Sequence, residues 1–228
     1  LQVECWNPRQ FTSDLHQTVD DRPYGGGPGM VMKVAPLQAA IDAARAVAPK
    51  PPSVVYLSPQ GRRIDQSMLE RCAGMEAVLL LAGRYEGVDE RLIDLEVDEE
   101  WSLGDFVLSG GEIAAMALID GVARLLPGAL GHAQSARCDS FSTGLLDHPH
   151  YTRPECHQGA AAPQVLLSGD HGAIERWRRQ QALVRSWLRR PELLKECRLS
   201  LAELEFLERF AAAKQSGREP TGTGVSPL

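Results

Sequence analysis

The chain has 228 residues, a net charge of −6 and 43% hydrophobic residues, an ordinary composition for a globular protein with a sizeable core. No apolar run is long enough to span a membrane, the first residues lack a signal-peptide pattern, and the five cysteines are scattered without a C-x-x-C pair. These features argue against a membrane-spanning or disulfide-stapled protein and predict a reducing, cytoplasmic location.

The charge is unevenly distributed along the chain. A net acidic protein by itself argues against a nucleic-acid partner, but residues 171–198 hold eight basic side chains against three acidic ones. Residues 89–100 hold seven acidic side chains against one arginine. A chain polarised in this way can still present a basic surface to phosphates.

The first half of the chain predicts alternating helices and strands. Residues 36–47 show helical spacing of apolar side chains with Pro36 at the first helical position, and a second helix is predicted over 65–72. The predicted strands are 54–57, which ends at a turn over 58–61, then 77–82 and the alternating stretch 95–97. This alternation favours an α/β fold with a parallel sheet.

A further helix is predicted after the segment Ser109–Glu112, which has the pattern of a capping box, and it runs to about Leu126. The entry of this helix exposes free backbone amides, which suit a carboxylate or phosphate, although a plain capped helix is the ordinary interpretation. No Lys-Ser/Thr pair follows, so the segment is not a P-loop.

The chain becomes helical again after residues 128–144, which lack periodicity and are interpreted as a mobile linker. Asp170 is predicted to cap a helix that ends at Pro191, and Ser200 to begin a second capping box. The helix over 171–190 carries six arginines beside its apolar stripe, which favours contact with phosphates over an ordinary solvated face. They are Arg176, Arg178, Arg179, Arg185, Arg189 and Arg190.

Two glycine-rich segments are candidate binding loops. Gly83–Gly87 follows a predicted buried strand, and its glycines allow close approach of the backbone, as they would in any tight turn. Tyr24–Gly29 is either a surface loop or a loop that folds over a ligand or a flipped base. The latter segment is not a G-x-G-x-x-G after a strand, so a Rossmann dinucleotide site is not expected.

Three single residues admit a structural and a functional interpretation. Asp139 is either a solvated loop acid or a general base that substrate binding brings into place. Arg124 is either a cation at a helix C-terminus or a group that faces developing negative charge. Glu86 is either an acid in the first turn of a helix or an acceptor for a ligand amine.

Cysteines and histidines between residues 138 and 157 invite a zinc hypothesis. Their spacing matches no usual structural zinc site, and two prolines interrupt it. We therefore predict no metal site and assign the histidines to the surface or to contacts with RNA. The set comprises Cys138, His148, His150, Cys156 and His157.

Five motifs in one order identify a resemblance that covers residues 1 to about 200. They are Asp20–Met30, Tyr56–Gly61, Gly83–Gly87, Trp101–Glu112 and Leu145–Glu155. Through them the chain resembles the bacterial tRNA (guanine-N1)-methyltransferases, a family with the trefoil-knot (SPOUT) fold that modifies the guanosine 3′ of the anticodon, position 37 of the tRNA.

The resemblance implies an α/β domain with a parallel sheet and a deep trefoil knot, then a small all-α C-terminal domain, in an obligate homodimer. The implied boundaries are a knotted cofactor-binding domain over 1–130, a flexible linker over 131–150, a helical tRNA-binding domain over 151–214 and a disordered tail over 215–228. In the family pattern Leu1–Trp6 would be the second strand, so the first strand and helix are expected to be absent from this sequence. The sequence is then either truncated or lacks a central strand, which would leave a sheet edge unpaired.

The resemblance also implies the site residues. Three loops would hold S-adenosylmethionine, with Glu86 near its amino group: Tyr56, Leu57, Ser58, Pro59, Gln60 and Gly61; Gly83, Tyr85, Glu86 and Gly87; Leu103, Gly104, Asp105, Phe106, Val107, Leu108, Gly110 and Gly111. Asp139 of the partner subunit would remove the guanine N1 proton, and Arg124 would steady the charge on O6. Contacts with the tRNA anticodon stem-loop are implied at Gly29, Ser135, Ser140, Arg178, Arg185 and Arg189. Magnesium is expected, but its site cannot be identified.

Two other functions stay open at this point. A catalytically inactive RNA-binding homologue would bind RNA but have no affinity for S-adenosylmethionine. A phosphate-binding hydrolase would use the helix entry at Ser109–Gly111, but the chain lacks a Walker lysine and a nucleophile–base pair.

Overall fold

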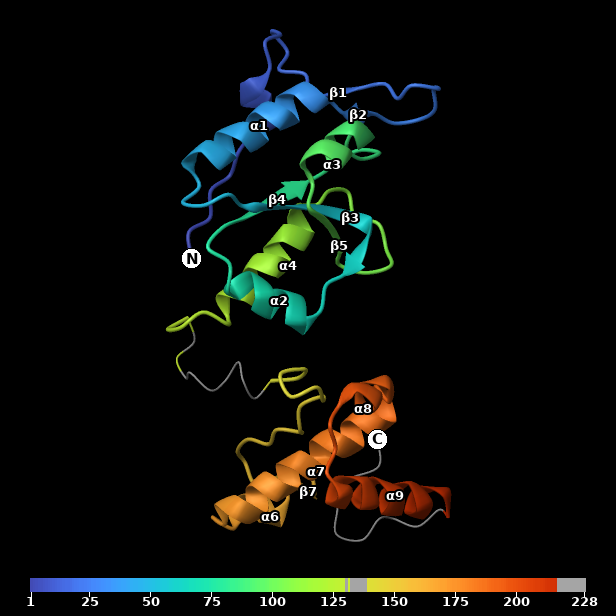
Figure 1. The fold of residues 1–228 in the computed structure, drawn as a ribbon. Helices are drawn as coiled ribbons and strands as arrows, with labels where there is room; N and C mark the ends of the chain where they lie inside the picture. Colours follow the sequence, from blue (N-terminus) through green and yellow to red (C-terminus); the bar gives the residue numbers. More distant parts are fainter. Residues whose placement is uncertain (130, 132–138, 217–228) are drawn as a thin grey trace. The chain divides into compact units, whose positions relative to one another are not determined.

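The computed structural model describes residues 1–129, 131 and 139–216 (Figure 1). The chain divides into two compact units, Leu1–Gly131 and His132–Leu228. No helix in the described part of the chain is long and apolar enough to cross a membrane. The domain boundaries implied by the resemblance stay predictions, and most of the predicted tail lies outside the described residues.

A three-stranded parallel sheet forms the centre of the first unit. Its order is β4 (Val78–Ala82), β3 (Ser53–Arg63) and β5 (Glu99–Ser102), so that β3 pairs with both neighbours. The predicted α/β class with a parallel sheet is confirmed, whereas the trefoil knot stays a prediction.

Helices cover both faces of this sheet (Figure 1). They are α1 (Val34–Val47) and α3 (Glu90–Glu96) on one face, and α2 (Gln66–Ala73) and α4 (Glu112–Ala123) on the other. Alternation along β3 sends Tyr56 into the cluster with α1 and α3, while Val55 and Leu57 enter the cluster with α2 and α4. The sheet is therefore buried on both faces, as its continuous apolar strands require.

The first 33 residues contribute little regular structure. They contain η1 (Pro8–Phe11) and the antiparallel pair β1 (Asp20–Asp21) and β2 (Val31–Met32), which flanks the loop Tyr24–Gly29. The strand expected over Leu1–Trp6 is wrong, because these residues are exposed and have no strand conformation. No strand in the described residues pairs with this segment, and a strand needs a partner for its backbone groups.

Three local predictions in the first unit are also wrong. Residues 95 and 96 end helix α3 and residue 97 is its C-cap, so they do not form a strand. This helix begins after Asp89, which caps it by accepting from the amide of Arg91. Helix α1 begins at Val34, so Pro36 is not its first residue. Helix α4 begins after Gly111 without a side-chain cap, so the capping box at Ser109–Glu112 does not form.

The second unit is mainly helical. Its helices are α6 (Gln164–Leu167), α7 (His171–Arg189), α8 (Glu192–Glu196) and α9 (Leu201–Gln215). Leu145, Leu183 and Leu207 form its core, and the predicted caps at Asp170 and Ser200 are confirmed. The unit also contains a short hairpin, so it is not all-α. Its strands are β6 (Cys156–His157) and β7 (Ala160–Ala161).

Candidate functional site

Three of the sequence motifs leave the sheet at one edge. Leu57 of the central strand pairs with Ala82 on one side and with Trp101 on the other. Since the strands are parallel, Ser58–Gly61, Gly83–Gly87 and Leu103–Gly111 all begin at the carboxyl end of the sheet. Open α/β sheets bind ligands at this edge.

Residues Ser58–Gly61 form an arch within strand β3. Leu57 and Arg62 both pair with Trp101, so the four residues between them bulge out of the ladder. The turn predicted after residue 57 is thus a bulge, and the strand continues to Arg63. A Cβ at Gly61 would lie 2.3 Å from the Glu100 carbonyl carbon and 2.4 Å from the Trp101 nitrogen, so only glycine fits there.

Gly83–Gly87 is a tight turn that lies on the ring of Tyr56. A Cβ at Gly83 would lie 2.9 Å from this ring, and both Tyr85 and Gly87 have positive φ, at 60° and 126°. Burial raises the pKa of Tyr56, a residue that is 6% exposed, although a hydrogen bond with the backbone of Val88 acts in the opposite direction. The Tyr56 side chain therefore packs against this loop.

The second and third loops are joined to each other. The Gly111 amide donates to the Gly83 carbonyl at 2.9 Å, and Arg84 and Gly110 form an isolated antiparallel bridge. The Arg84 guanidinium pairs with Glu112 at 2.7 Å. Glu112 thus links two loops, where the sequence pattern predicted a helix cap.

The glycine loop Tyr24–Gly29 reaches the same place. The Glu86 amide donates to the Met30 carbonyl at 3.0 Å, and a Cβ at Gly29 would lie 2.2 Å from a Glu86 carboxylate oxygen. Tyr24 itself is fully exposed. Gly29 and Glu86, which the resemblance assigns to RNA and cofactor, are therefore close neighbours.

The third loop exposes apolar side chains. Phe106 is 54% and Val107 84% exposed, whereas Ser102 at the loop entrance is buried. The Ser102 hydroxyl accepts from the Gly104 amide at 3.2 Å and holds the start of the loop. The exposed part offers an apolar surface to a ligand or to a second protein chain.

The two residues expected to act on the substrate lie in different units. Arg124 is the C-cap of α4 in the first unit, and Asp139 belongs to the second. Their predicted meeting across two protomers stays a prediction. Among the residues assigned to RNA, the Ser140 hydroxyl accepts from the Asp147 amide at 2.9 Å, and Ser135 lies outside the described residues.

The arginines of helix α7 and its C-cap fall into two groups, those that form an ion pair with a carboxylate and those for which no such pair is found among the described residues. Arg179 pairs with Glu203 of α9 at 2.6 Å, and Arg190 pairs with Glu192. In the described part of the chain, no carboxylate pairs with the other four arginines of the helix, which include the predicted contacts Arg178, Arg185 and Arg189. These three retain positive charge that is not neutralised by a neighbouring acid.

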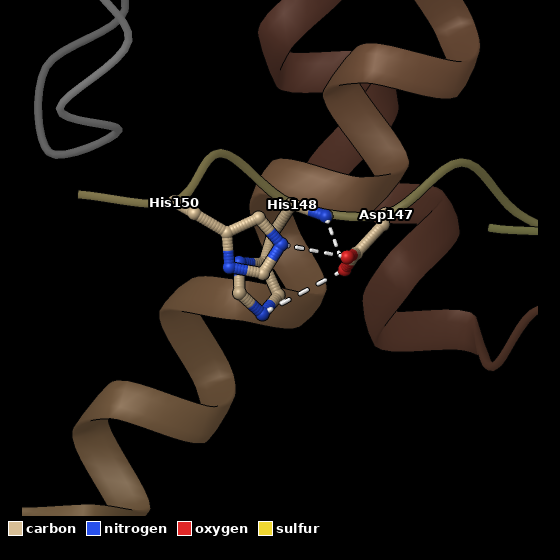
Figure 2. A group of neighbouring side chains, drawn as sticks. All are labelled: Asp147, His148 and His150. Carbon is tan, nitrogen blue, oxygen red and sulfur yellow. Dashed lines mark hydrogen bonds and ion pairs between the residues drawn. The ribbon is translucent and has the colours of Figure 1, made fainter. Parts of the chain in front are cut away.

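Asp147, His148 and His150 form a cluster that sequence reasoning did not recognise (Figure 2). The zinc hypothesis grouped the two histidines with cysteines more distant in the sequence and did not consider the aspartate. The pattern Asp-His-x-His nevertheless places three metal-ligand types within four residues. Burial lowers the pKa of His148, while its contacts with Pro149 and Asp147 act in the opposite direction. Cys156 and His157 belong to β6 and are not part of this cluster.

Comparison with known proteins identifies the family. A family model described as tRNA (Guanine-1)-methyltransferase TrmD matches residues 1–196. A protein of Halorhodospira halophila is 60% identical over 212 residues, which are 93% of this chain and 80% of the relative. One of Nitrosococcus oceani is 61% identical over 221 residues, 96% of this chain and 88% of the relative. Both are named tRNA (guanine-N(1)-)-methyltransferase. This chain belongs to that family.

Membership of the tRNA (guanine-1)-methyltransferase family confirms the resemblance drawn from the five motifs. The family consists of methyltransferase enzymes, so the loops at the sheet edge belong to a fold that carries this activity. The individual residue assignments stay predictions.

Proposed function

We propose that the protein transfers a methyl group from S-adenosylmethionine to N1 of guanosine 37 in tRNA. The observation that carries this proposal is the arrangement of Ser58–Gly61, Gly83–Gly87 and Leu103–Gly111, which leave neighbouring strands at one sheet edge, with the second and third loops hydrogen-bonded to each other. Relatives at about 60% identity are named for tRNA guanine-N1 methylation, which supports the substrate.

The three loops suit a small polar cofactor. Their glycines carry no side chain that would keep a ligand away from the backbone, and the exposed Glu86 carboxylate can accept from an amino group. Phe106 and Val107 can cover an apolar ring. S-adenosylmethionine, when bound, supplies a methyl group already activated as a sulfonium, so the protein chiefly has to position it. We propose that this binding region lies within a trefoil knot.

The chemistry requires a base because guanine N1 is not nucleophilic while it is protonated. We propose that Asp139 of one protomer takes this proton. A carboxylate is a weak base for the purpose, so the negative charge that builds on O6 needs stabilisation, which the permanently charged Arg124 would supply. The target base must also leave the anticodon stack to reach the site.

A homodimer follows from assigning Asp139 to the partner subunit. Exposed apolar side chains on the third loop and on α4 support a protein–protein surface in the first unit. They are Phe106, Val107, Ile113 and Met116. We propose that the arginines of α7 hold the tRNA, since four of them form no ion pair with a carboxylate of the described residues. Magnesium use stays a prediction.

Methyl transfer to unmodified tRNA, with the modified nucleotide mapped, tests this function. We expect one methyl group at N1 of guanosine 37, and no transfer to a tRNA with adenosine at that position. Transfer to another nucleotide would contradict the proposed substrate. Absence of both transfer and S-adenosylmethionine binding would instead favour an inactive RNA-binding protein.

A further inference from the structure

A second chemical centre lies on the segment that precedes the hairpin of the second unit. Asp147, His148 and His150 each place one ligand atom within 4.8 Å of the others (Figure 2). The His150 Nε2 lies 2.7 Å from Asp147 Oδ2, and the His148 Nε2 lies 3.7 Å from Asp147 Oδ1. Two imidazoles and a carboxylate therefore converge on one point.

The orientation of His148 suits a metal ligand. Its Nδ1 lies 3.1 Å from the Pro149 carbonyl, to which it can donate. With the proton on Nδ1, Nε2 has a lone pair that faces the Asp147 carboxylate, and a cation between these two acceptors would stabilise the arrangement. Histidine ligands commonly donate their second nitrogen to a backbone carbonyl in this way.

The cluster is also anchored to the rest of the unit. Leu145, two residues before Asp147, is 1% exposed in the core. The Leu146 amide donates to the Ser186 hydroxyl of α7 at 2.9 Å. On the other side, the His148 ring lies 4.4 Å from the His150 ring and 6.4 Å from the buried ring of Trp177, measured between centroids. A supported set of ligands loses less freedom when it binds an ion.

We propose that Asp147, His148 and His150 bind one divalent first-row transition metal ion, with Zn²⁺ as the reference ion. Such ions accept imidazole and carboxylate ligands at about 2.0–2.2 Å, and the His150 side chain, which is 71% exposed, has room to rotate toward that geometry. Magnesium and calcium prefer all-oxygen sites, so this centre differs in kind from a magnesium site. Three protein ligands leave a position open to water or to another ligand.

The test is calorimetric titration of the full-length, chelator-treated protein with Zn²⁺, with and without excess Mg²⁺. We expect one Zn²⁺ per chain at this centre and no competition from Mg²⁺. His150→Ala should fold normally, because this side chain is 71% exposed. Loss of an outer-shell partner typically lowers metal affinity by about 10–100-fold, so loss of a direct ligand should lower Zn²⁺ affinity by at least about that much. His157→Ala, a nearby histidine outside the cluster, is the matched control and should bind Zn²⁺ as the parent does.

Substitution of Co²⁺ for Zn²⁺ separates this centre from the cysteines. We expect visible d–d absorption bands typical of Co²⁺ bound to nitrogen and oxygen ligands. These bands should disappear in His150→Ala and in Asp147→Asn. A sulfur-to-cobalt charge-transfer band, or equal affinity in His150→Ala and His157→Ala, would overturn the proposal. Unchanged Zn²⁺ affinity in His150→Ala together with weaker tRNA binding would also overturn it and would assign these histidines to RNA contact.

Discussion

Gly61 belongs both to a candidate cofactor loop and to strand β3, and it packs directly against the backbone of β5. A Cβ there would meet backbone atoms of Glu100 and Trp101, which cannot rotate away as a side chain would. By contrast, no atom of the described residues lies within 4 Å of a Cβ built at Gly131. The absence of a side chain at Gly61 is thus a packing requirement of the arch.

We expect Gly61→Ala to lower the free energy of unfolding of the first unit by about 1–3 kcal/mol, the usual cost of forcing extra atoms into a packed site. Urea denaturation measures the change, and S-adenosylmethionine affinity should fall with it because the arch is displaced. Gly131→Ala is the control and should alter neither quantity. Equal stability of the two variants would mean that β5 can move away from the arch at no cost.

Among the helices, α2 depends on a single carboxylate at its start. Asp65 accepts from the Met68 amide at 3.0 Å, and the hydroxyl of Ser67 lowers the pKa of Asp65 in the folded protein. A carboxyl group whose pKa is lowered by folding adds stability at pH values above its unfolded pKa of about 3.9. This contribution is lost as the pH falls through the folded value.

Asp65→Ala should therefore destabilise the protein by about 1 kcal/mol at neutral pH, as loss of an N-cap does. The difference from the parent should shrink toward zero in acid, below a pH of about 3.9. Urea denaturation across this pH range measures it, with Glu70→Gln on the same helix as the control for loss of a negative charge. A difference that stays constant with pH would show that the carboxylate does not act through its ionised form.

The arginines of α7 that form no ion pair with a carboxylate of the described residues predict how tRNA binding depends on salt. Neutralising Arg178, Arg185 and Arg189 together to glutamine should weaken tRNA binding and reduce the slope of log affinity against log salt, by about 0.7–0.9 for each phosphate that the helix no longer neutralises. Filter binding at several salt concentrations measures the slope. Arg209→Gln, on α9, is the control and should leave it unchanged. Weaker binding with the original slope would argue for a structural role of these arginines.

Elements set by local chemistry could be predicted from the sequence, and those set by distant partners could not. The strands at 77–82 and 54–57 follow from continuous apolar runs, and the cap at Asp170 follows from its neighbours. The bulge at 58–61 depends on how β3 pairs with β5, which no local pattern encodes. Glu112 was assigned to a cap because its actual partner, Arg84, lies 28 residues away.

The same distinction applies to the candidate site. Its loops are recognisable as motifs, but their common edge depends on the strand order β4-β3-β5, which places the central strand first in the chain. The cluster of Asp147, His148 and His150 escaped detection because spacing was compared with known zinc patterns. The cluster instead consists of near neighbours in the sequence, Asp147, His148 and His150.

At the scale of the whole molecule, the proposed sharing of the active site between two protomers predicts complementation between inactive protomers. Asp139→Asn should bind S-adenosylmethionine but not transfer methyl groups, whereas Gly110→Asp should lose the cofactor while keeping Asp139. In a mixed dimer one site would combine an intact cofactor loop with an intact Asp139. Equal co-expression should then restore about a quarter of the parent activity, since about half of the dimers are mixed and each has one complete site.

Methyl transfer by the unfractionated co-expressed protein, with each variant alone as the control, measures this recovery. Failure of the mixed dimer to exceed the two parents, although both variants fold and dimerise, would show that Asp139 serves the site of its own protomer. Retained activity of Asp139→Asn alone would remove this residue from the mechanism altogether.

The arch at Ser58–Gly61 touches the backbone of β5 directly before that strand runs into the loop Leu103–Gly111. Neither segment can shift without displacing the other, so the two should gain order as one cooperative unit. A molecule bound at either segment would then slow amide hydrogen exchange in both, including at positions that it never touches.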